Sequence, residues 1–483
     1  MAKYYITTTA PYVNAEPHIG FALEIIQADV LARYHRSVGD SVFFNTGTDE
    51  HGKKIYETAV ENKQIPQDYV DYYANKFDDL KKSLNLSYNS FNRTTYPEHI
   101  EAAQEIWKRC YENGYIKKGI YRAKYCVGCE LEKTDSDLVD GKCPLHPNKE
   151  IEMIEEENYF FKFSDPRIQK ALLAYYNDNP DFVVPPHRQK EIYNFVAGGL
   201  TDFSISRVAE KMPWGVPVPG DPTQVQYVWF DALTYYISAL GWSKNQKNFD
   251  DFWGTVEKPN AIQVAGKDNL RQQTSMWQAM LFAAGLPFSK QVLIHGFITS
   301  GGAKMSKSLG NVVNPLEYVS KYGTDALRYY LLAKMSPFED SDFTKEKFEA
   351  AYASDLQNGI GNLVSRVATM ATPLAPQAGG QASIISKEVA LAIEKYRFDE
   401  AMKLIWEKVK ACNTTISERE VWKLEGAERE QVLTQLIGEM RQIAADLASF
   451  MPETAGKIMQ AFAGKIEKIT PLFPRLTSDT ATK

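Results

Sequence analysis

The first hundred residues alternate between strand and helix signals, and this alternation restricts the possible folds more than any other feature of the chain. Residues 3–9 are rich in β-branched and aromatic side chains, which predicts a strand. The two prolines in residues 10–17 predict a loop, and apolar residues at helical spacing over 19–34 predict a helix. A second strand is expected at residues 41–45. This order is typical of a parallel α/β sheet, in which ligands bind where the strands end.

The alternation breaks down between residues 117 and 225, which hold a cysteine cluster and Pro-rich turns and which we interpret as an inserted domain. Strand and helix signals return at residues 225–230, 261–265 and 292–294, and we expect them to complete a nucleotide-binding fold. Beyond about residue 348 the chain is predicted to be helical. One apolar stripe in that region predicts the core of a helical bundle: Leu433, Leu436, Met440, Ile443 and Leu447.

Composition and charge narrow the class of protein. A chain of 483 residues is expected to form about two to four domains, and 44% hydrophobic with 24% charged residues is globular usage. The net charge of −6 argues against a surface coated with positive charge for indiscriminate nucleic-acid binding, although a local basic groove could still bind RNA. Apolar runs are too short for a membrane span and the first residues do not resemble a signal segment, so we expect a cytoplasmic protein.

Three cysteines and one histidine have the spacing of a metal site: Cys126, Cys129, Cys143 and His146. Two pairs of ligands, each separated by two residues, match tetrahedral zinc. Four protein ligands leave no open position, so we predict one structural Zn²⁺ rather than a catalytic ion. A disulfide or redox pair is the alternative, and both the expected compartment and the histidine disfavour it.

The predicted helix at residues 19–34 opens with the motif His18-Ile19-Gly20-Phe21. Gly20 would let adenine and ribose approach the backbone closely. His18, near the positive end of the helix, could donate a hydrogen bond to phosphate oxygens. Alone the motif is weak, because a histidine at a helix start is usually a cap or a satisfied polar residue.

A second, cationic motif has the sequence Gly-Gly-Ala-Lys-Met-Ser-Lys-Ser and occupies residues 301–308. Lys304 and Lys307 are compact positive charges, suited to the charge that develops on a phosphate and a departing pyrophosphate. The glycines could act as a hinge that lets the loop close over a triphosphate. A solvated basic turn is the alternative, and the His18 motif upstream, with a nucleotide-fold pattern between, disfavours it.

Together the two motifs resemble the His-x-Gly-His and Lys-Met-Ser-Lys-Ser signatures of the class I aminoacyl-tRNA synthetases, and the closer match is to the methionyl-tRNA synthetases. The resemblance extends over nearly the whole chain through further motifs in the same order, which occupy residues 10–14, 48–52, 202–207, 227–232, 266–268 and 322–328. It implies an α/β protein: a Rossmann-type nucleotide-binding domain with an inserted zinc-knuckle connective domain, followed by an α-helical bundle.

The resemblance also implies a function and a set of site residues. Mg²⁺ with ATP would activate L-methionine to methionyl-adenylate, and the methionyl group would pass to tRNA(Met). The implied catalytic residues are His18, Lys304 and Lys307, and the ATP-binding set adds Gly20, Phe21, Gly266 and Asp268. The implied methionine-binding residues are Ala10, Tyr12, Asp49 (which would hold the amino group), Trp229, Ala232, Leu233, Tyr236, Asn269, Gln273 and Trp277. The implied anticodon-binding residues are Asn362, Arg366 and Trp422.

Some positions depart from the family pattern. Phe21 replaces the second histidine of the first signature and cannot hydrogen-bond phosphate or ribose. Asn269 and Gln273 stand where the family usually has isoleucine and histidine, so the wall of the pocket is more polar. Val421, before Trp422, stands where the family generally has proline.

The resemblance divides the chain into five parts. They are the first half of the Rossmann catalytic domain (1–116), the connective domain with its zinc knuckle (117–225), the second half of the catalytic domain (226–299), a signature-loop and stem-contact region (300–347) and a helical anticodon-binding domain (348–483). A monomer is the simpler expectation. Three alternatives remain open: a class I synthetase for another amino acid, a small-molecule nucleotidyltransferase, and an RNA-binding protein without catalysis.

Overall fold

The computed structural model describes residues 1–129, 131–305, 310–372, 374 and 384–475. The chain forms two compact units, each assembled from segments that are separated in the sequence. Unit 1 contains Met1–Glu16, Asp40–Asp79 and Tyr88–Ile294. Unit 2 contains Pro17–Gly39, Leu80–Ser87 and His295–Lys483.

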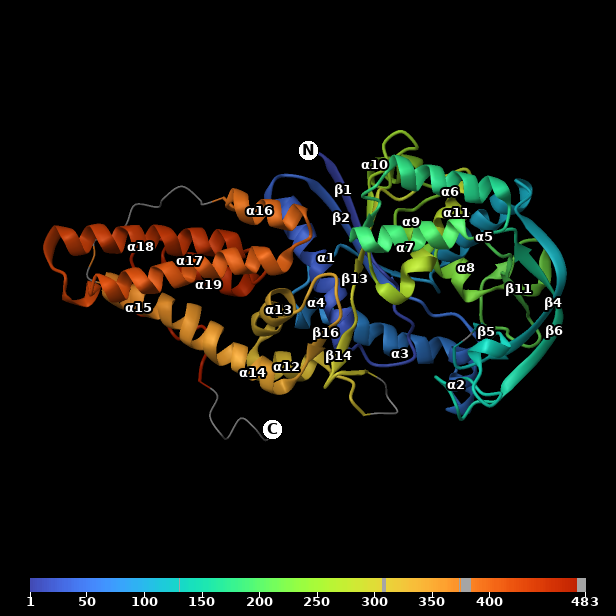
Figure 1. Ribbon diagram of the computed structural model, residues 1–483, viewed down its shortest axis with the longest axis horizontal. Helices are drawn as coiled ribbons and strands as arrows, with labels where there is room; N and C mark the ends of the chain where they lie inside the picture. Colours follow the sequence, from blue (N-terminus) through green and yellow to red (C-terminus); the bar gives the residue numbers. More distant parts are fainter. Residues whose placement is uncertain (130, 306–309, 373, 375–383, 476–483) are drawn as a thin grey trace. The chain divides into compact units, whose positions relative to one another are not determined.

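Unit 1 is built on a six-stranded sheet with the strand order β3-β2-β1-β12-β13-β7 (Figure 1). The strands span Lys3–Thr8 (β1), Ser41–Thr48 (β2), Ser90–Arg93 (β3), Val183–Val184 (β7), Ala261–Gly266 (β12) and Gln291–His295 (β13). β1 pairs in parallel with β2 on one side and with β12 on the other, so the strand order reverses beside β1. In parallel sheets ligands bind at the carboxyl ends of the strands, at such a reversal.

The central strands are buried on both faces, which explains their composition. Every residue of β12 is buried, as is all of β1 except Lys3. A strand covered on both faces needs apolar and β-branched residues at consecutive positions. The two strands predicted near the amino terminus are therefore confirmed, and β2 continues three residues beyond its predicted end, to Thr48. Helices α5 (Pro97–Glu112), α6 (Pro166–Asp178) and α11 (Trp277–Ala283) pack together over the aromatic core of this unit.

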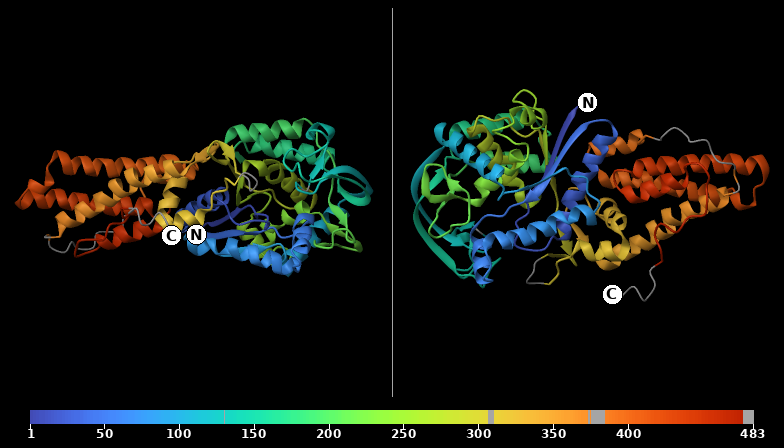
Figure 2. Two further views of the ribbon diagram at one scale, coloured as in Figure 1. Left: turned by 90° about the horizontal axis from the view of Figure 1, so that it is seen from below. Right: turned by 180° about the vertical axis from the view of Figure 1, so that it is seen from behind.

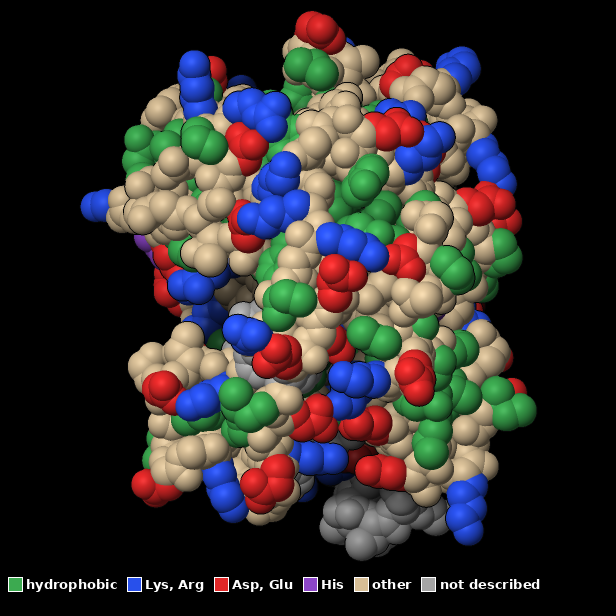
Figure 3. Space-filling model, turned by 90° about the vertical axis from the view of Figure 1, so that its right-hand side faces the viewer, with side chains coloured by type: hydrophobic (Ala, Val, Ile, Leu, Met, Phe, Trp, Pro, Cys, Tyr) green, Lys and Arg blue, Asp and Glu red, His purple; other side chains and the backbone are tan. Residues whose placement is uncertain are grey.

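The region predicted to be an insertion contains a long antiparallel ribbon, β4 (Ile116–Cys126) paired with β6 (Ile151–Phe161). β5 (Leu131–Lys133) and β8 (Phe203–Ser204) flank the ribbon and complete a four-stranded sheet. A separate three-stranded sheet contains β9 (Ser206–Val208), β10 (Pro217–Val218) and β11 (Asp221–Gln226). Figure 3 shows the side on which this ribbon lies, with Lys and Arg side chains interspersed among Asp and Glu. Cross-strand ion pairs contribute to this mixture, such as Arg122 with Glu155 at 2.7 Å.

Unit 2 is mainly helical and includes α1 (Ile19–Ser37), in which most residues are buried. Its other helices include α12 (Pro315–Tyr322), α13 (Thr324–Ala333), α15 (Asn362–Ala371), α16 (Lys387–Glu394), α17 (Phe398–Glu418), α18 (Gly426–Leu447) and α19 (Pro452–Ala461). Of these, α15, α17, α18 and α19 lie side by side as a bundle (Figures 1 and 2). The predicted apolar stripe lies on α18 and is buried, from Leu433 to Leu447, which confirms the expected bundle core.

Among the residues that the structure describes, no helix combines the length and the hydropathy needed to cross a membrane.

Candidate active site and metal centre

The loops that follow β1 and β2 meet at the carboxyl edge of the sheet. Asp49 donates its backbone N–H to the carbonyl of Pro11 at 3.0 Å, and its own carbonyl accepts from Val13 at 3.1 Å. These two bonds form a parallel bridge between Tyr12 and Asp49. Asp49 is only 7% exposed, whereas Tyr12 and Ala10 are half-buried. The structure therefore brings two predicted methionine-binding residues, Tyr12 and Asp49, together at the reversal of strand order.

A buried ion pair holds the loop that carries Asp49. The next residue, Glu50, is completely buried and accepts two hydrogen bonds from Arg93, at 2.6 and 2.9 Å. Thr48 and Thr95 also donate to this carboxylate, and the indole of Trp214 donates to the Glu50 carbonyl at 2.7 Å. Burial alone would lower the pKa of Arg93, but Glu50 and, to a smaller extent, Asp71 outweigh it and raise the pKa above its usual range. The backbone at Asp49 is therefore fixed by the charge of its neighbour.

A second buried carboxylate, Asp231, connects the same loop to helix α8 (Val228–Ala232). Its two oxygens contact His51 Nδ1 at 3.0 Å and His99 Nε2 at 3.4 Å. Burial opposes the ionised form, but the two imidazoles outweigh it and hold the pKa of Asp231 below its usual value. Because α8 carries Trp229 and Ala232, both half-buried, Asp231 sets the position of two predicted pocket residues. Sequence reasoning did not assign a role to Asp231, although it lies within a quoted motif.

Three further predicted pocket residues contact one another. The ring of Tyr236 lies 5.9 Å from the fully buried indole of Trp277. The Gln273 amide donates to the Tyr236 hydroxyl, and Gln263 donates to the Gln273 side-chain carbonyl at 2.9 Å. Gln273 is therefore satisfied by the protein itself, and a neutral amide keeps this arrangement at any pH. Two other predicted pocket residues are Leu233, which is buried, and Asn269, which is half-buried.

Gly266 and Asp268, predicted to lie near the ribose, follow one another at the end of β12. Gly266 is the last strand residue and is buried, and Asp268 lies exposed in the 3-10 turn η2 (Lys267–Asn269). Both positions are at the same carboxyl edge of the sheet, which is the edge expected for a nucleotide.

Arg207 occupies a cage of aromatic rings beside a cavity of about 380 Å³ in unit 1. Its guanidinium carbon lies 4.7, 5.4 and 4.5 Å from the ring centroids of Tyr121, Tyr125 and Tyr227. The lining also includes Gly52, which follows the Asp49–His51 loop. A cation held over several rings in a buried site is stabilised by their quadrupoles. Arg207 thus ties the inserted strands to the start of helix α8.

The first signature motif lies at the amino end of α1, in unit 2. His18 is the N-cap residue, and its Nδ1 accepts a hydrogen bond from the Gly20 N–H at 3.1 Å. Since Nδ1 is the acceptor, the neutral imidazole carries its proton on Nε2, the nitrogen that would donate to a phosphate. His18 is exposed, and Phe21 is buried with 7% of its surface exposed. Gly20 is half-buried. The cap and the proposed phosphate contact therefore use different nitrogens.

Residues 301–304 of the second signature motif form the turn and the second strand of a β-hairpin in unit 2. Strands β14 (Ile298–Ser300) and β15 (Ala303–Lys304) are joined by Gly301 and Gly302, whose φ angles are +61° and +77°. Two positive φ angles define the tight turn that best matches the twist of a hairpin, and glycine adopts them without strain. The exposed Lys304 extends from this turn, with Nζ 5.1 Å from the ring centroid of Phe297. Lys307 lies outside the described residues.

The four predicted metal ligands converge in unit 1. Their ligand atoms, from Cys126, Cys129, Cys143 and His146, all lie within 4.8 Å of one another. Cys129 Sγ is 3.5 Å from Cys143 Sγ and 3.2 Å from His146 Nδ1. Bonds of about 2.0–2.3 Å to a tetrahedral ion place ligand atoms about 3.3–3.8 Å apart, so this cluster fits one metal ion. The cysteines form no disulfide.

Gly128 is a part of the metal centre that sequence reasoning missed. A Cβ at residue 128 would lie 2.4 Å from Cγ of the His146 ring, closer than real atoms approach. Only glycine in the turn between Cys126 and Cys129 therefore leaves room for the imidazole.

The predicted anticodon-binding residues lie on the helical bundle. Asn362 is exposed and Arg366 is half-buried, one turn apart on the same face of α15. Trp422 lies in the 3-10 turn η6 (Val421–Lys423) after α17, with 49% of its surface exposed. An indole exposed to this degree can stack on an unpaired base.

Comparison with known protein families matches residues 4–152 and 136–368 to the family described as "tRNA synthetases class I (M)". The chain belongs to this family. Among curated relatives, a methionine--tRNA ligase of Synechocystis sp. is 40% identical over 95% of this chain and 89% of its own length. One of Clostridium acetobutylicum is 38% identical over 99% of this chain and 79% of its own length.

A comparison with solved structures points to the same family as the comparison of sequences. Methionyl-tRNA synthetase of Mycobacterium tuberculosis in complex with methionyl-adenylate has a TM-score of 0.88 and 31% identity to this chain. The match covers 98% of this chain and all of that one. The resemblance drawn from the sequence motifs and the expected fold class are thereby confirmed for this class I (M) synthetase.

Replacing Cys143 of this synthetase with serine should abolish stoichiometric metal binding. Serine is a much weaker ligand than a thiolate for a soft tetrahedral site, so the content should fall from about one ion per chain toward background. Inductively coupled plasma mass spectrometry of the purified protein measures this directly. The matched control is Cys412→Ser, at a buried cysteine on α17, which should keep its metal. Equal metal content in the two variants would contradict the assignment.

Proposed function

We propose that this chain uses ATP to activate L-methionine as methionyl-adenylate and then transfers the methionyl group to tRNA(Met). The observation that carries the proposal is family membership along almost the whole chain, including the pocket loops, both signatures and the helical bundle. The bridge between Tyr12 and Asp49 and the ring contact between Tyr236 and Trp277, all within unit 1, support the same reaction.

The amino acid would be held by charge at one end and by aromatic rings at the other. The Asp49 carboxylate would pair with the substrate ammonium group, in a loop fixed by Glu50 and Arg93. Tyr12, Trp229, Tyr236 and Trp277 would surround the thioether, and each sulfur–aromatic contact contributes about 0.3–1.5 kcal/mol. The remaining wall residues are Ala10, Ala232, Leu233, Asn269 and Gln273. Because Gln273 already bonds to Gln263 and Tyr236, it adds no unsatisfied polar group to the pocket.

Adenylate formation needs alignment and positive charge rather than acid–base chemistry. The methionine carboxylate oxygen attacks the α-phosphorus of ATP, and the bond from that phosphorus to the pyrophosphate breaks. We assign His18 Nε2–H, Lys304 and Lys307 to the phosphate charge, and Gly266 and Asp268 to the ribose side. Mg²⁺ bound with ATP would neutralise further phosphate charge. Phe21 has no hydrogen-bond donor, so the groups named above must supply the phosphate contacts that a second histidine in the signature would make.

The metal centre and the helical bundle would serve the RNA. Zn²⁺ is the ion that three thiolates and one imidazole favour, and with four protein ligands its role would be to hold the inserted domain in shape. Asn362, Arg366 and Trp422 would read the anticodon by hydrogen bonds and stacking. The five-part functional division of the chain, at residues 116, 225, 299 and 347, belongs to this proposal.

Pyrophosphate exchange with each amino acid in turn tests the substrate. We expect exchange with methionine above all other amino acids, and a different preferred amino acid would favour a class I synthetase of another specificity.

Lys304→Ala should lower methionine-dependent exchange about 100-fold or more, since it removes a charge that stabilises the transition state. The control is Lys345→Ala, at an exposed lysine of the same unit, which should not change the rate. An unchanged rate for Lys304→Ala would remove that lysine from the chemistry.

Trp422→Ala should raise the KM for tRNA(Met) in aminoacylation without changing methionine-dependent pyrophosphate exchange. Loss of one stacking contact removes about 1–3 kcal/mol of RNA binding, which is about a 5- to 150-fold effect. Steady-state aminoacylation measures this KM. Tyr72→Ala, at an aromatic residue of unit 1 with similar exposure (54%), serves as the control. If both variants bind RNA equally well, Trp422 does not read the anticodon.

A further inference from the structure

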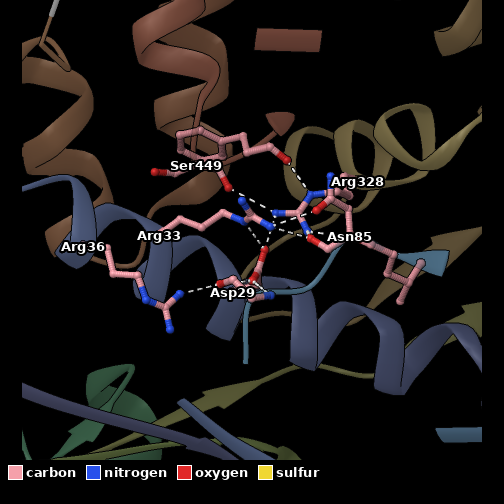
Figure 4. Close-up of polar contacts among 9 residues, drawn as sticks. Asp29, Arg33, Arg36, Asn85, Arg328 and Ser449 are labelled. Carbon is pink, nitrogen blue, oxygen red and sulfur yellow. Dashed lines mark hydrogen bonds and ion pairs between the residues drawn. The ribbon is translucent and has the colours of Figure 1, made fainter. Parts of the chain in front are cut away.

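A carboxylate in the middle of helix α1 is fully buried and surrounded by cations. Asp29 Oδ2 contacts Arg33 Nε at 2.7 Å and Arg328 Nη2 at 2.8 Å, and Oδ1 accepts from the backbone and hydroxyl of Ser87 at 2.7 and 2.6 Å (Figure 4). Burial alone would raise the pKa of Asp29, but Arg328 and Arg33 outweigh it and lower the pKa below its usual value. The carboxylate is therefore ionised, and it joins two other segments of unit 2 to α1: the segment that holds Ser87 and helix α13, which carries Arg328.

Arg328, on helix α13, uses all five of its N–H groups on four backbone carbonyls and the Asp29 carboxylate. Nε donates to the carbonyl of Phe450 at 2.7 Å, and Nη2 donates to Ser449 at 3.1 Å as well as to Asp29. Nη1 donates to the carbonyls of Leu84 and Asn85, at 3.1 and 3.5 Å. The side chain has no exposed surface. A planar guanidinium with five fixed donors holds all its partners in one geometry, which an ammonium group cannot do.

The carbonyls of Ser449 and Phe450 belong to the corner between α18 and α19 of the bundle. The same corner receives a second contact from α13, because Asp325 accepts a hydrogen bond from the backbone N–H of Thr454 at 2.6 Å. Thr454 lies in the first turn of α19, and the two carbonyls follow the end of α18. A cation thus meets the carbonyl end of one helix and a carboxylate meets the N–H end of the next. One turn of α13 therefore binds this corner twice, through the Asp325 carboxylate and the Arg328 guanidinium.

The other end of α1 carries the first signature and is joined to the second signature region. The backbone N–H of Ile19 donates to the carbonyl of Val313, and Glu24 pairs with His295 at 3.1 Å. Asp29 lies 11 residues from His18, about 16 Å along a rigid helix. Helix α1 is therefore fixed near its start to the signature region and near its middle, through Arg328, to the corner of the bundle.

We propose that Arg328 is a positioning residue: through Asp29 and the α18–α19 corner it sets the register between the helical bundle and the signature helix α1, and thereby aligns bound RNA for aminoacyl transfer. The inference rests on the function proposed above. Adenylate formation needs no RNA, so it does not depend on this register. Transfer does, because a small misplacement of the reacting ends of a bound substrate can lower the rate about 100-fold.

Arg328→Lys in the full-length chain tests the inference, since lysine keeps the charge beside Asp29 but cannot hold the four carbonyls. Methionine-dependent pyrophosphate exchange should stay within about twofold, while kcat for aminoacylation of a tRNA(Met) transcript should fall about tenfold or more. Affinity for the transcript, measured by filter binding, should also stay within about twofold, because the bundle surface is intact. A residue that only stabilised the fold would lower both activities together, in proportion to the folded fraction.

The matched control is Asp446→Asn. Asp446 is another fully buried carboxylate, paired with Lys408 at 2.6 Å. In the part of the chain that the structure describes, its hydrogen-bond partners are Ser386, Lys408 and Gln442, none of which lies on α1 or α13. It should leave the ratio of transfer to exchange unchanged. Should Arg328→Lys fail to fold, Asp325→Ala removes the second contact to the corner without leaving a buried cation unpaired, and the same selective loss is expected.

A transfer-to-exchange ratio within about twofold of the unsubstituted chain, in whichever of these variants folds, would overturn the coupling. Failure of the proposed function is a different result, because the unsubstituted chain itself would then show no methionine-dependent exchange.

Discussion

Buried carboxylates paired with cationic side chains hold together segments that are far apart in this sequence. Glu50 with Arg93, Asp231 with two histidines and Asp29 with Arg328 each remove an acidic group from water almost completely. An isolated buried charge is very unfavourable, so each pair forms only when both partners and their hydrogen bonds are in place. The geometry around the candidate pocket and along α1 thus depends on complete networks, and each network fixes a loop or helix that carries a predicted functional residue.

The sequence contained enough information for the fold class because the strongest signals are local. Consecutive apolar and β-branched residues mark β1, which is buried on both faces, and a stripe at helical spacing marks α18. The metal centre could also be predicted from the sequence. Its ligands form two short pairs, so a single reversal of the chain between the pairs brings all four together, as the ligand distances show. The motifs also located the loops at the carboxyl edge of the sheet.

The residues that sequence reasoning missed act through partners distant in the chain. Nothing near Glu50 indicates Arg93 as its partner, and nothing near Asp29 indicates a side chain on α13. Gln273 looked like a polar departure, and only coordinates reveal that Gln263 and Tyr236 satisfy it. The division into compact units differs from a linear reading too, because α1 follows β1 directly and yet belongs with the carboxyl-terminal half. Pairings of this kind depend on tertiary contacts that no local pattern specifies.

This late pairing has a consequence for synthesis on the ribosome. Asp29 emerges long before Arg328, which lies 299 positions later (328 − 29). At about 5–20 residues per second, helix α1 is synthesised about 15–60 s before Arg328, the second guanidinium beside Asp29, and before helices α13 and α16, which pack against α1. The nascent chain should therefore be most exposed to aggregation, and most dependent on chaperones, during the interval before α13 has left the exit tunnel.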